Sequence, residues 1–373
     1  MNIKEEKKGI SLIVLVITII VIIILAVAVI LSIANNNPIE NAKKAQEDHN
    51  KAELKEAANI EYSYYYTENK LKNEDIDINL IRENLVKRGF TQEDVNMVQV
   101  LDYGIDLVKY PPIVPNGFKY LTGTVETGYV IKNIVDGNEF VWIPVDDINE
   151  FQREDGYYKG NKQSYLKTTS EPYKNATQAE LNEYDEMKKS VEYYHGFYIA
   201  RYESSQGEDG KAYSIKNKKP WINIFWGKSV TDLSGGAVEE ARKVYSSNRE
   251  GIKEKDPVST LCYGVEWDQT VRFIEKNYPG ILVDSSGKGN YEASEIINTG
   301  SNDQYAQNNI YDMAGNVLEW TMEANETYSR VIRGGNHAYT GLVHPISLRD
   351  YVTPGAVAGA SGEVGFRIAL YIK

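Results

Sequence analysis

The chain is poor in the residues that build disulfide frameworks and transition-metal centres. It has one cysteine, Cys262, among 373 residues, and only four histidines: His49, His195, His337 and His344. A lone cysteine cannot form an internal disulfide, which excludes a small disulfide-stapled domain. Runs of lysine and arginine are also missing, and the formal net charge is -12. We therefore expect no nucleic-acid partner, because such binding needs a stripe of cations for the phosphates.

Two common catalytic signatures are absent from the sequence. It contains neither a G-x-S-x-G nucleophile elbow nor a phosphate-cradling G-x-x-x-x-G-K-S/T loop. Phenylalanine is scarce, with 8 residues, whereas tyrosine is abundant, with 28. Tyrosine combines a large contact area with a polar tip, so its excess is typical of wet recognition surfaces and also of half-exposed β structure. A length of 373 residues suffices for one large domain or two ordinary ones.

Charge is missing altogether from residues 10–34, which read ISLIVLVITIIVIIILAVAVILSIA. As a helix this run spans roughly 37 Å at 1.5 Å per residue, enough to cross a bilayer core of about 30 Å. We therefore expect a transmembrane or pilin-like helix over 10–34. The lysines before it, Lys4, Lys7 and Lys8, favour a cytoplasmic N-terminus. The predicted location is the cell membrane, with a single pass and an extracellular C-terminal domain.

The first nine residues, MNIKEEKKG, resemble the leader of type IV pilins and pseudopilins. The resemblance implies cleavage by a prepilin peptidase between Gly9 and Ile10, before the apolar run rather than after it as in a secretory signal. It also implies pilin or pseudopilin subunits as partners in a surface filament. Val14 stands where that family usually has the glutamate that helps subunits align, which argues against assembly but not against cleavage. The alternative is a plain single-span anchor.

Residues 35–110 are expected to form a helical stalk and linker. Residues 38–72 are rich in alanine, glutamate and lysine, which predicts a solvated helix. Residues 76–101 show a second amphipathic pattern, for which Gly89 is a suitable C-terminal residue. Pro111, Pro112 and Pro115 mark the boundary to the next domain.

From residue 111 to 373 the pattern changes to short apolar runs separated by turn signals. Runs at 140–145, 196–203, 330–335 and 365–372 predict strands. Helices are expected at Thr177–Lys189, Val238–Ser246 and Glu266–Asn277. The polar connections are longer than those of a compact sandwich. We therefore expect an α+β domain with much irregular structure.

An ordered set of blocks in this region resembles the formylglycine-generating enzyme, or sulfatase-modifying factor, domain. IYDMAGNVLEWT is close to that family's LYDMAGNVWEWT, and NEFVWIPV, GFYIARYESS, RVIRGGN and GFRI follow its other strands and turns. STLCYGVEWDQTVRFIE keeps only Thr260, Glu266 and Trp267 of the family's RLPTEAEWE block. The resemblance covers Phe118–Ile372 and implies a loop-rich variant of the C-type lectin fold.

The resemblance implies a structural calcium ion (Ca2+) held by two side chains and two backbone carbonyls, at Asp312, Gly315, Val317 and Glu319. Calcium takes six to eight oxygen ligands. A straight strand would separate carboxylates seven residues apart, but a loop folded at Gly315 can bring them together. The residues alone also permit a simple turn capped by Asp312 and Asn316, with Trp320 in the core.

Catalysis by the family's oxidase chemistry is not expected. Those oxidases use a pair of copper-binding cysteines just after the RGG segment, and no cysteine follows Gly335 here. Cys262 is expected to be a small buried residue. An iron site built from His337, His344 and Asp350 is a remote alternative to ordinary exposed loop histidines. We assign no catalytic residues, and a formylglycine-generating-enzyme-like oxidoreductase with altered metal chemistry stays as the alternative function.

The segment 336–363 lies where the family presents its pocket. The candidate ligand-binding residues are Asn336, His337, Tyr339, Thr340, His344, Ser347, Asp350 and Tyr351. We therefore expect a displayed recognition domain for a glycan or a surface protein. Arg333, Arg349 and Arg367 are expected to anchor carboxylates such as Glu319 or Glu363.

A sharper hypothesis concerns diversification of this segment. Targets of diversity-generating retroelements carry this fold, with a variable segment between a GG turn and a C-terminal GFR. Asn, His, Tyr, Ser and Asp are the residues that adenine mutagenesis of asparagine-type codons yields. The alternative is an ordinary ligand loop of fixed sequence.

Overall fold

The structure, a computed structural model, describes residues 38–72, 76–101, 104–153, 169–172, 176–245, 253–325, 329–355 and 363–373. The predicted leader, its cleavage point at Gly9 and Ile10, and the predicted span over 10–34 lie outside these residues. Among the helices that are described, none combines the length and the apolar character needed to cross a membrane.

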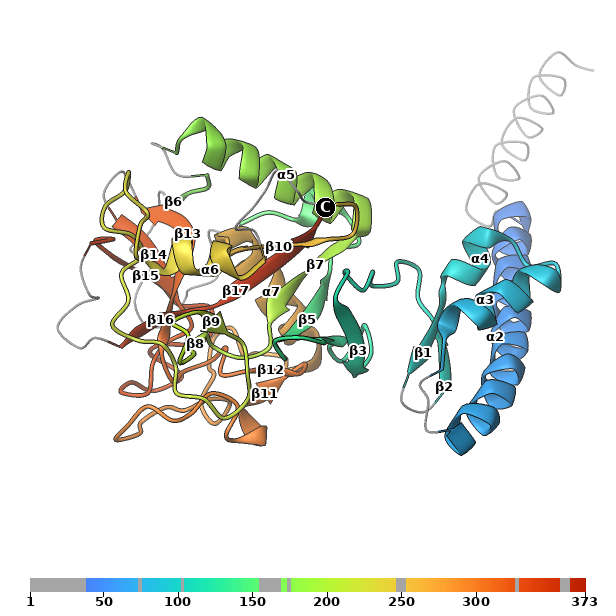
Figure 1. The fold of residues 1–373 in the computed structure, drawn as a ribbon. Helices are drawn as coiled ribbons and strands as arrows, with labels where there is room; N and C mark the ends of the chain where they lie inside the picture. Colours follow the sequence, from blue (N-terminus) through green and yellow to red (C-terminus); the bar gives the residue numbers. More distant parts are fainter. Residues whose placement is uncertain are drawn as a thin grey trace, which may run out of the picture. The chain divides into compact units, whose positions relative to one another are not determined.

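The chain divides into two compact units, Met1–Val100 with Gly104–Leu107, and Leu101–Tyr103 with Val108–Lys373. The first unit contains one long helix, two short helices and a two-stranded sheet (Figure 1): α2 (Pro38–Lys72), α3 (Ile78–Lys87), α4 (Gln92–Asn96), β1 (Val98–Leu101) and β2 (Gly104–Leu107). The helix predicted over 38–72 is confirmed.

The amphipathic pattern over 76–101 is interrupted in the structure. Helix α3 ends at Lys87, Gly89 follows with a φ of +103°, and a Thr91–Asp94 capping box starts α4. The chain then enters β1, so the apolar residues continue along a strand rather than a helix. Both parts share one small core, formed by Leu54, Ala58, Ile81, Leu85, Val95, Val98 and Ile105.

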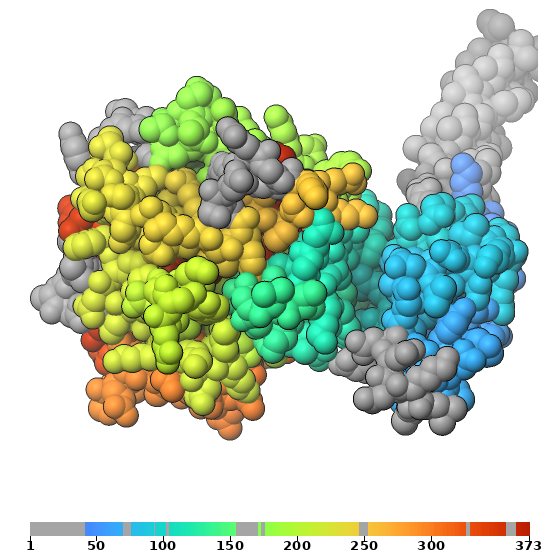
Figure 2. Space-filling view, in the orientation of Figure 1, coloured from blue at the N-terminus to red at the C-terminus, as the bar shows by residue number. Residues whose placement is uncertain are grey.

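The second unit is built on a six-stranded antiparallel sheet with the order β10-β17-β7-β5-β4-β3. These strands are β3 (Phe118–Thr122), β4 (Val130–Asn133), β5 (Glu139–Pro144), β7 (Gly196–Ala200), β10 (Pro257–Leu261) and β17 (Ile368–Ile372). The last strand of the chain thus lies between β10 and β7, where Figure 1 shows it in red. All five residues of β17 are buried, and little of this strand is visible on the face drawn in Figure 2.

A second sheet has the order β15-β14-β13-β16, with β6 (Thr169–Ser170) paired to β13. Its main strands are β13 (Leu318–Asn325), β14 (Ser329–Arg333), β15 (Arg349–Val352) and β16 (Val364–Phe366). β13 pairs parallel with β16 and antiparallel with β14. Two further pairs are β8 (Ser205–Gln206) with β9 (Ala212–Tyr213) and β11 (Ala306–Gln307) with β12 (Ile310–Tyr311).

The three predicted helices of this unit are confirmed, with ends that shift by a few residues. They are α5 (Gln178–Tyr194), α6 (Ala237–Tyr245) and α7 (Gly264–Asn277), with short 3-10 helices η1 (Ile148–Glu150) and η3 (Asp303–Tyr305). Thr177 and Glu180 cap α5 reciprocally, which explains where it begins. α5 packs on β17 and β7, and Ser190 Oγ donates to the Ile372 carbonyl at 2.7 Å.

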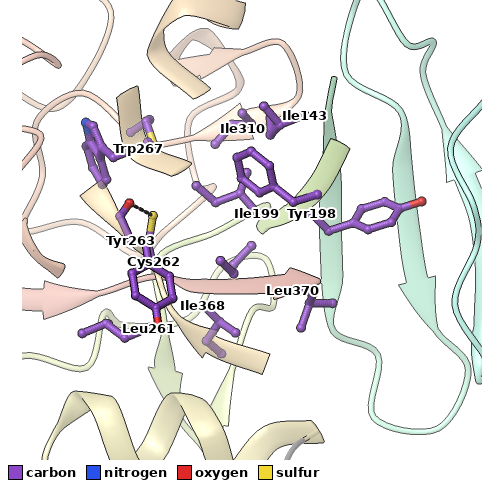
Figure 3. Close-up of a cluster of buried hydrophobic side chains, with 14 of the residues drawn as sticks. Ile143, Tyr198, Ile199, Leu261, Cys262, Tyr263, Trp267, Ile310, Ile368 and Leu370 are labelled. Carbon is purple, nitrogen blue, oxygen red and sulfur yellow. Dashed lines mark hydrogen bonds between the residues drawn. The ribbon is translucent and has the colours of Figure 1, made fainter. Parts of the chain in front are cut away.

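The core of the second unit lies around the six-stranded sheet. Figure 3 shows Tyr198 and Ile199 of β7, Leu370 of β17 and Trp267 of α7 in this cluster, and all four are fully buried. β5 is buried at five of its six positions, so its sequence reads as a continuous apolar run instead of alternating. The mixed α and β composition predicted for 111–373 is confirmed.

Candidate functional site

The loop between β12 and β13 is held from inside the protein. Asp312, Gly315 and Asn316 have positive φ values of 54°, 78° and 59°, so the chain turns sharply there. Asp312 Oδ2 accepts hydrogen bonds from the Gly300 amide at 2.7 Å and from Thr299 Oγ1 at 3.1 Å. Burial raises the pKa of Asp312. The side chain therefore ties this loop to the one before it.

Glu203, which follows β7, is a second anchor of the same loop. Its Oε2 accepts from Asn316 Nδ2 at 2.6 Å and its Oε1 from the Val317 amide at 3.2 Å. Burial raises the pKa of Glu203 well above its ordinary value, and the nearby charges of Asp312 and Glu319 add to the rise. The role of Glu203 was not predicted, although the residue lies within the GFYIARYESS block.

Glu319 is paired with Arg367. Arg367 Nη2 lies 2.7 Å from Glu319 Oε1, and Arg367 Nε contacts both oxygens, at 3.1 and 3.0 Å. The same guanidinium donates to the carbonyls of Ala200 and Tyr311, both at 3.0 Å. Burial raises the pKa of Glu319, and Arg367 opposes that rise. The expected pairing of Arg367 with Glu319 is confirmed, as is the burial of Trp320.

The arrangement offers only part of the predicted calcium site. Asp312 Oδ1 is buried and has no hydrogen-bond partner among the described residues, so one oxygen is available to a cation. Glu319, in contrast, faces Arg367. Within the described ranges, no three His, Cys, Asp or Glu side chains form a group that could hold a metal. The predicted site combines two side chains with the carbonyls of Gly315 and Val317, and calcium stays a prediction.

The arginines of β14 and β15 have different partners from those expected. Arg333 and Arg349 both donate to Asp268 of α7, rather than to Glu319 or Glu363. They also approach Glu323 of β13, with Arg349 Nε 3.1 Å and Arg333 Nη1 3.6 Å from its oxygens. All four side chains are 0–3% exposed. The cluster joins α7 to the second sheet beneath the RGG turn.

Cys262 is a core residue, as expected. Its thiol lies beside Tyr263, Trp267 and Ile368 in Figure 3, and Sγ contacts the Tyr263 carbonyl oxygen at 3.3 Å. Burial raises the pKa of this thiol well above its usual range, and the charge of Glu266 raises it further. A buried neutral thiol is a poor nucleophile and a poor metal ligand.

The GG turn fixes where the next loop begins. Gly335 has a φ of +78°, and a Cβ placed there would lie 2.3 Å from the His344 carbonyl oxygen. Only glycine therefore allows the two ends of the 335–344 loop to come this close. The Gly334 carbonyl accepts from the Gly315 amide at 2.8 Å, so the turn also rests on the buried loop before β13.

Three of the predicted ligand-binding residues are buried. Asn336, His337 and Ser347 are 3%, 8% and 0% exposed. Ser347 Oγ donates to the Leu282 carbonyl at 2.5 Å, and both Asn336 and His337 bond to Glu363. The expectation of exposed loop histidines is wrong for His337. These side chains support the loop from beneath and do not face solvent.

The loop between His337 and Ser347 carries exposed side chains. Tyr339, Leu342 and Val343 are 48%, 46% and 39% exposed. Together with Thr340 and His344 they form what we call the loop surface. Tyr339 stacks on His344 with ring centroids 3.8 Å apart. Leu342 and Val343 were not predicted, because only polar and aromatic side chains were considered as ligand contacts. Two aliphatic residues directly after Thr340 and Gly341 were the available signal.

Asp350 and Tyr351 lie on a separate element, β15. Both are exposed, and Tyr351 retains 45% of its surface. Across the sheet they pair with Ile332 and Val331 of β14. The structure thus divides the eight predicted residues into a buried support, the loop surface and an exposed strand position.

Comparison with known proteins agrees with the blocks quoted above. Residues 152–372, more than half of the chain, match the sulfatase-modifying factor enzyme 1-like domain family. The chain belongs to this family. The match begins after β5, so the NEFVWIPV block lies outside the matched residues although its strand pairs with β7. No curated protein matches the chain.

Two solved structures are similar to the sulfatase-modifying-factor-like domain. Treponema denticola variable protein 1 has 17% identity and a TM-score of 0.29, over 47% of this chain and 84% of that one. PvdO from Pseudomonas aeruginosa has 13% identity and a TM-score of 0.36, over 65% of this chain and 98% of that one. Similarity at this level says nothing about a shared ligand or activity.

Proposed function

We propose that the chain is a membrane-anchored recognition protein whose sulfatase-modifying-factor-like domain binds an extracellular ligand through the loop surface. The observation that carries the proposal is a group of exposed apolar and aromatic side chains, Tyr339, Leu342 and Val343, on a backbone that hydrogen bonds hold in place. The Tyr339 carbonyl accepts from the Glu292 amide at 3.0 Å, and the Gly341 carbonyl from Ser285 at 3.1 Å. Side chains presented in this way lose little conformational entropy on binding.

The composition of the loop surface favours a protein ligand over a glycan. Leu342 and Val343 offer no hydrogen bonds to sugar hydroxyls, whereas they fit an apolar patch on another protein. Tyr339 adds a large ring with a polar tip, the type of side chain that is enriched at binding hot spots. A glycan ligand remains the other outcome of the binding test below.

The oxidase alternative finds less support. The chain has a single cysteine, so a copper-binding pair cannot form within it. That cysteine is buried. Metal analysis separates the two functions: copper or iron at one equivalent, with turnover of a cysteine-containing peptide, would establish an oxidoreductase with altered chemistry.

The anchor and its processing rest on the sequence alone. The uncharged run over 10–34 supports a single pass, with residues 111–373 displayed outside the cell on the helical stalk. N-terminal sequencing of protein from membranes tests the leader. A mature chain that starts at Ile10 supports prepilin processing, and one that starts at Met1 supports a plain anchor. Recovery from sheared surface filaments would place it among pilin subunits.

Binding is tested by screening the full-length chain against arrays of extracellular proteins and glycans. Tyr339→Ala and Leu342→Asn should each weaken a captured interaction by about tenfold or more, the loss typical of a hot-spot side chain. Tyr193→Ala is the matched control, because Tyr193 is an exposed tyrosine on α5 outside the proposed site. If Tyr193→Ala and Tyr339→Ala weaken ligand binding equally, or if neither weakens it, the ligand does not bind through the loop surface.

Diversification is tested in the genome rather than in the protein. A near-copy of the coding segment for 335–367 beside a reverse transcriptase gene would identify the chain as a retroelement target. The absence of such a copy would contradict diversification and leave an ordinary ligand loop of fixed sequence.

A further inference from the structure

A second segment, 281–295, lies against the loop surface. It follows helix α7 in the chain and is far from residues 337–347 in sequence. Three backbone hydrogen bonds of 2.9–3.1 Å nevertheless join the two segments: Ser285 to Gly341, Glu292 to Tyr339, and Ala293 to His337. In addition, Ser285 Oγ accepts from the Ile346 amide at 2.9 Å. The two segments are therefore fixed to each other by their main chains.

Gly341 is the point of closest approach between the two segments. A Cβ placed on Gly341 would lie 2.2 Å from the Ser286 amide nitrogen and 2.4 Å from the Ser285 carbonyl carbon. Only a residue without a side chain allows this approach. Leu342 directly follows Gly341, and Val283 lies two residues before Ser285. Exposed side chains of both segments therefore border the contact.

Val283 extends the exposed apolar surface onto the second segment. Its side chain is 53% exposed, and its amide donates to the Gly280 carbonyl at 3.0 Å, so its backbone is held in a turn. On the neighbouring segment the exposed apolar side chains are Tyr339, Leu342 and Val343. We call these three residues and Val283 the apolar patch. Single exposed apolar residues are common, whereas a group drawn from two joined segments is typical of an interaction site.

The charge beside the apolar patch is mainly negative. Segment 281–295 carries three acids, Asp284, Glu292 and Glu295, and one base, Lys288, and all four are exposed. Residues 337–347 contain no aspartate, glutamate, lysine or arginine to offset them. Hydrogen bonds from Ser286 lower the pKa of Asp284, which is therefore ionised at neutral pH.

This combination of apolar centre and acidic surroundings restricts the partner. Charges across an interface are arranged to be complementary, so the surface favours a partner that carries positive charge around apolar side chains. A second copy of this chain does not meet that requirement, because its formal net charge is also -12 and the same acids would face each other. Nucleic acids and anionic lipid surfaces are repelled for the same reason.

We propose that the apolar patch binds a cationic protein, whose own apolar side chains cover the patch while its lysines or arginines face Asp284 and Glu292. The charge of the partner and the contact at Val283, outside the segment 336–363, go beyond the proposed function but rest on it. The acids act mainly on the rate of association, and the apolar side chains mainly on the lifetime of the complex.

Two synthetic peptides probe the surface of the full-length chain, which is held in nanodiscs of uncharged lipid. Both form amphipathic helices with the same leucine face, and their polar face carries lysine in one peptide and glutamate in the other. Surface plasmon resonance should show binding of the lysine peptide only, relative to empty nanodiscs. Raising the salt concentration from about 20 mM to about 500 mM should slow association by about tenfold, because salt screens the steering charges.

One substitution tests the apolar contact of Val283. Val283→Asn should weaken binding of the lysine peptide by about fivefold, because roughly half of a valine side chain would no longer be covered by apolar atoms. Val135→Asn is the matched control. Val135 is 90% exposed between β4 and β5, outside the apolar patch, and its substitution should leave binding unchanged.

A charge-neutralising pair tests the acids. Asp284→Asn combined with Glu292→Gln should slow association of the lysine peptide by about threefold or more at low salt and reduce the salt dependence. Asparagine at 284 can still accept from the Ser286 amide, so the turn is kept. Asp185→Asn combined with Glu192→Gln is the matched control, because it removes the same charge from exposed positions of α5.

The proposal is overturned if both peptides bind equally, if neither binds, or if the two charge-neutralised variants lose the same affinity. The last result would mean adsorption to the net charge of the chain. The proposed function is judged separately, by capture of an extracellular ligand and its loss in Tyr339→Ala. A captured ligand that needs Tyr339 but is insensitive to Val283→Asn and to both acids supports the proposed function and contradicts the cationic partner. Lysine-peptide binding that follows the expected pattern, with no extracellular ligand captured, supports the surface chemistry and contradicts the proposed function.

Discussion

Two loops of the second unit touch each other and differ in almost every other respect. The buried loop, 312–317, contacts the segment that leads into the loop surface, through the Gly315–Gly334 and Asn316–His337 backbone hydrogen bonds. Asp312 and Asn316 are 1% and 0% exposed, whereas Tyr339 is 48% exposed. One loop directs its polar side chains inward, and the other carries exposed side chains on a backbone that its neighbours hold.

The difference separates the side chains that build the fold from those that face a ligand. In the buried loop the side chains of Asp312 and Asn316 make anchoring contacts, so a substitution of either residue removes structural hydrogen bonds. In the loop surface the anchoring contacts to neighbouring loops are made by the carbonyls of Tyr339 and Gly341. Its side chains are therefore open to change at small cost in stability, which is what a recognition loop requires.

The largest expected effect comes from breaking the pair beneath the buried loop. Arg367→Ala leaves the Glu319 carboxylate without its guanidinium and removes the bonds to Ala200 and Tyr311. Loss of one partner of a buried pair costs about 3–5 kcal/mol, so the free energy of unfolding should fall by that amount. Chemical denaturation of the full-length chain, followed by near-ultraviolet circular dichroism, measures it.

Lys216→Ala provides the matched control for that substitution. Lys216 pairs with Asp303 at 2.7 Å, but the two side chains are 47% and 77% exposed. An exposed pair contributes about 0–1 kcal/mol, so the unfolding midpoint should move little. Equal losses in Arg367→Ala and Lys216→Ala would contradict the structural role assigned to the buried pair.

Much of this buried scaffold could be predicted from the sequence because its residues obey local rules. The Thr177–Glu180 capping box starts α5, and continuous apolar runs correspond to buried strands. The pairing of Arg367 with Glu319 was also predicted. The partners of Arg333 and Arg349 were not, because Asp268 lies 65 and 81 residues away and only the packing of α7 brings it near.

The division of segment 336–363 into support and surface could not be predicted either. Asn336, His337 and Tyr339 look alike as recognition residues, and burial alone separates them. That burial depends on Ala293 and Glu363, whose positions follow from the tertiary fold. The sequence pattern therefore does not tell which side chains of the predicted segment face solvent.

Calcium should have an intermediate effect on the free energy of unfolding, and it should act on the buried loop only. If Asp312 Oδ1 is an ion ligand, calcium added to an ion-stripped sample at about 100 times its Kd stabilises the fold by about 2.7 kcal/mol. Differential scanning calorimetry would then show a rise in Tm of several degrees, and Asp312→Asn would abolish the rise.

If calcium leaves the Tm unchanged, the calcium prediction is wrong. It would leave Arg367 and Glu203 as the groups that hold the buried loop. Magnesium chloride at the same concentration controls for general salt effects, since Mg²⁺ demands smaller, near-octahedral sites and keeps its water.

The smallest expected effect on stability belongs to the loop surface. Leu342→Asn removes an aliphatic side chain that is 46% exposed, so the free energy of unfolding should change by no more than about 0.5 kcal/mol. Leu348, which is 4% exposed, is the matched leucine, and Leu348→Ala should cost about 2–5 kcal/mol. A loss at Leu342 as large as that at Leu348 would mean that the loop side chains stabilise the fold, and the distinction between the two loops would disappear. Stability unchanged at Leu342, combined with lost ligand capture, would show that the side chain is retained for binding alone.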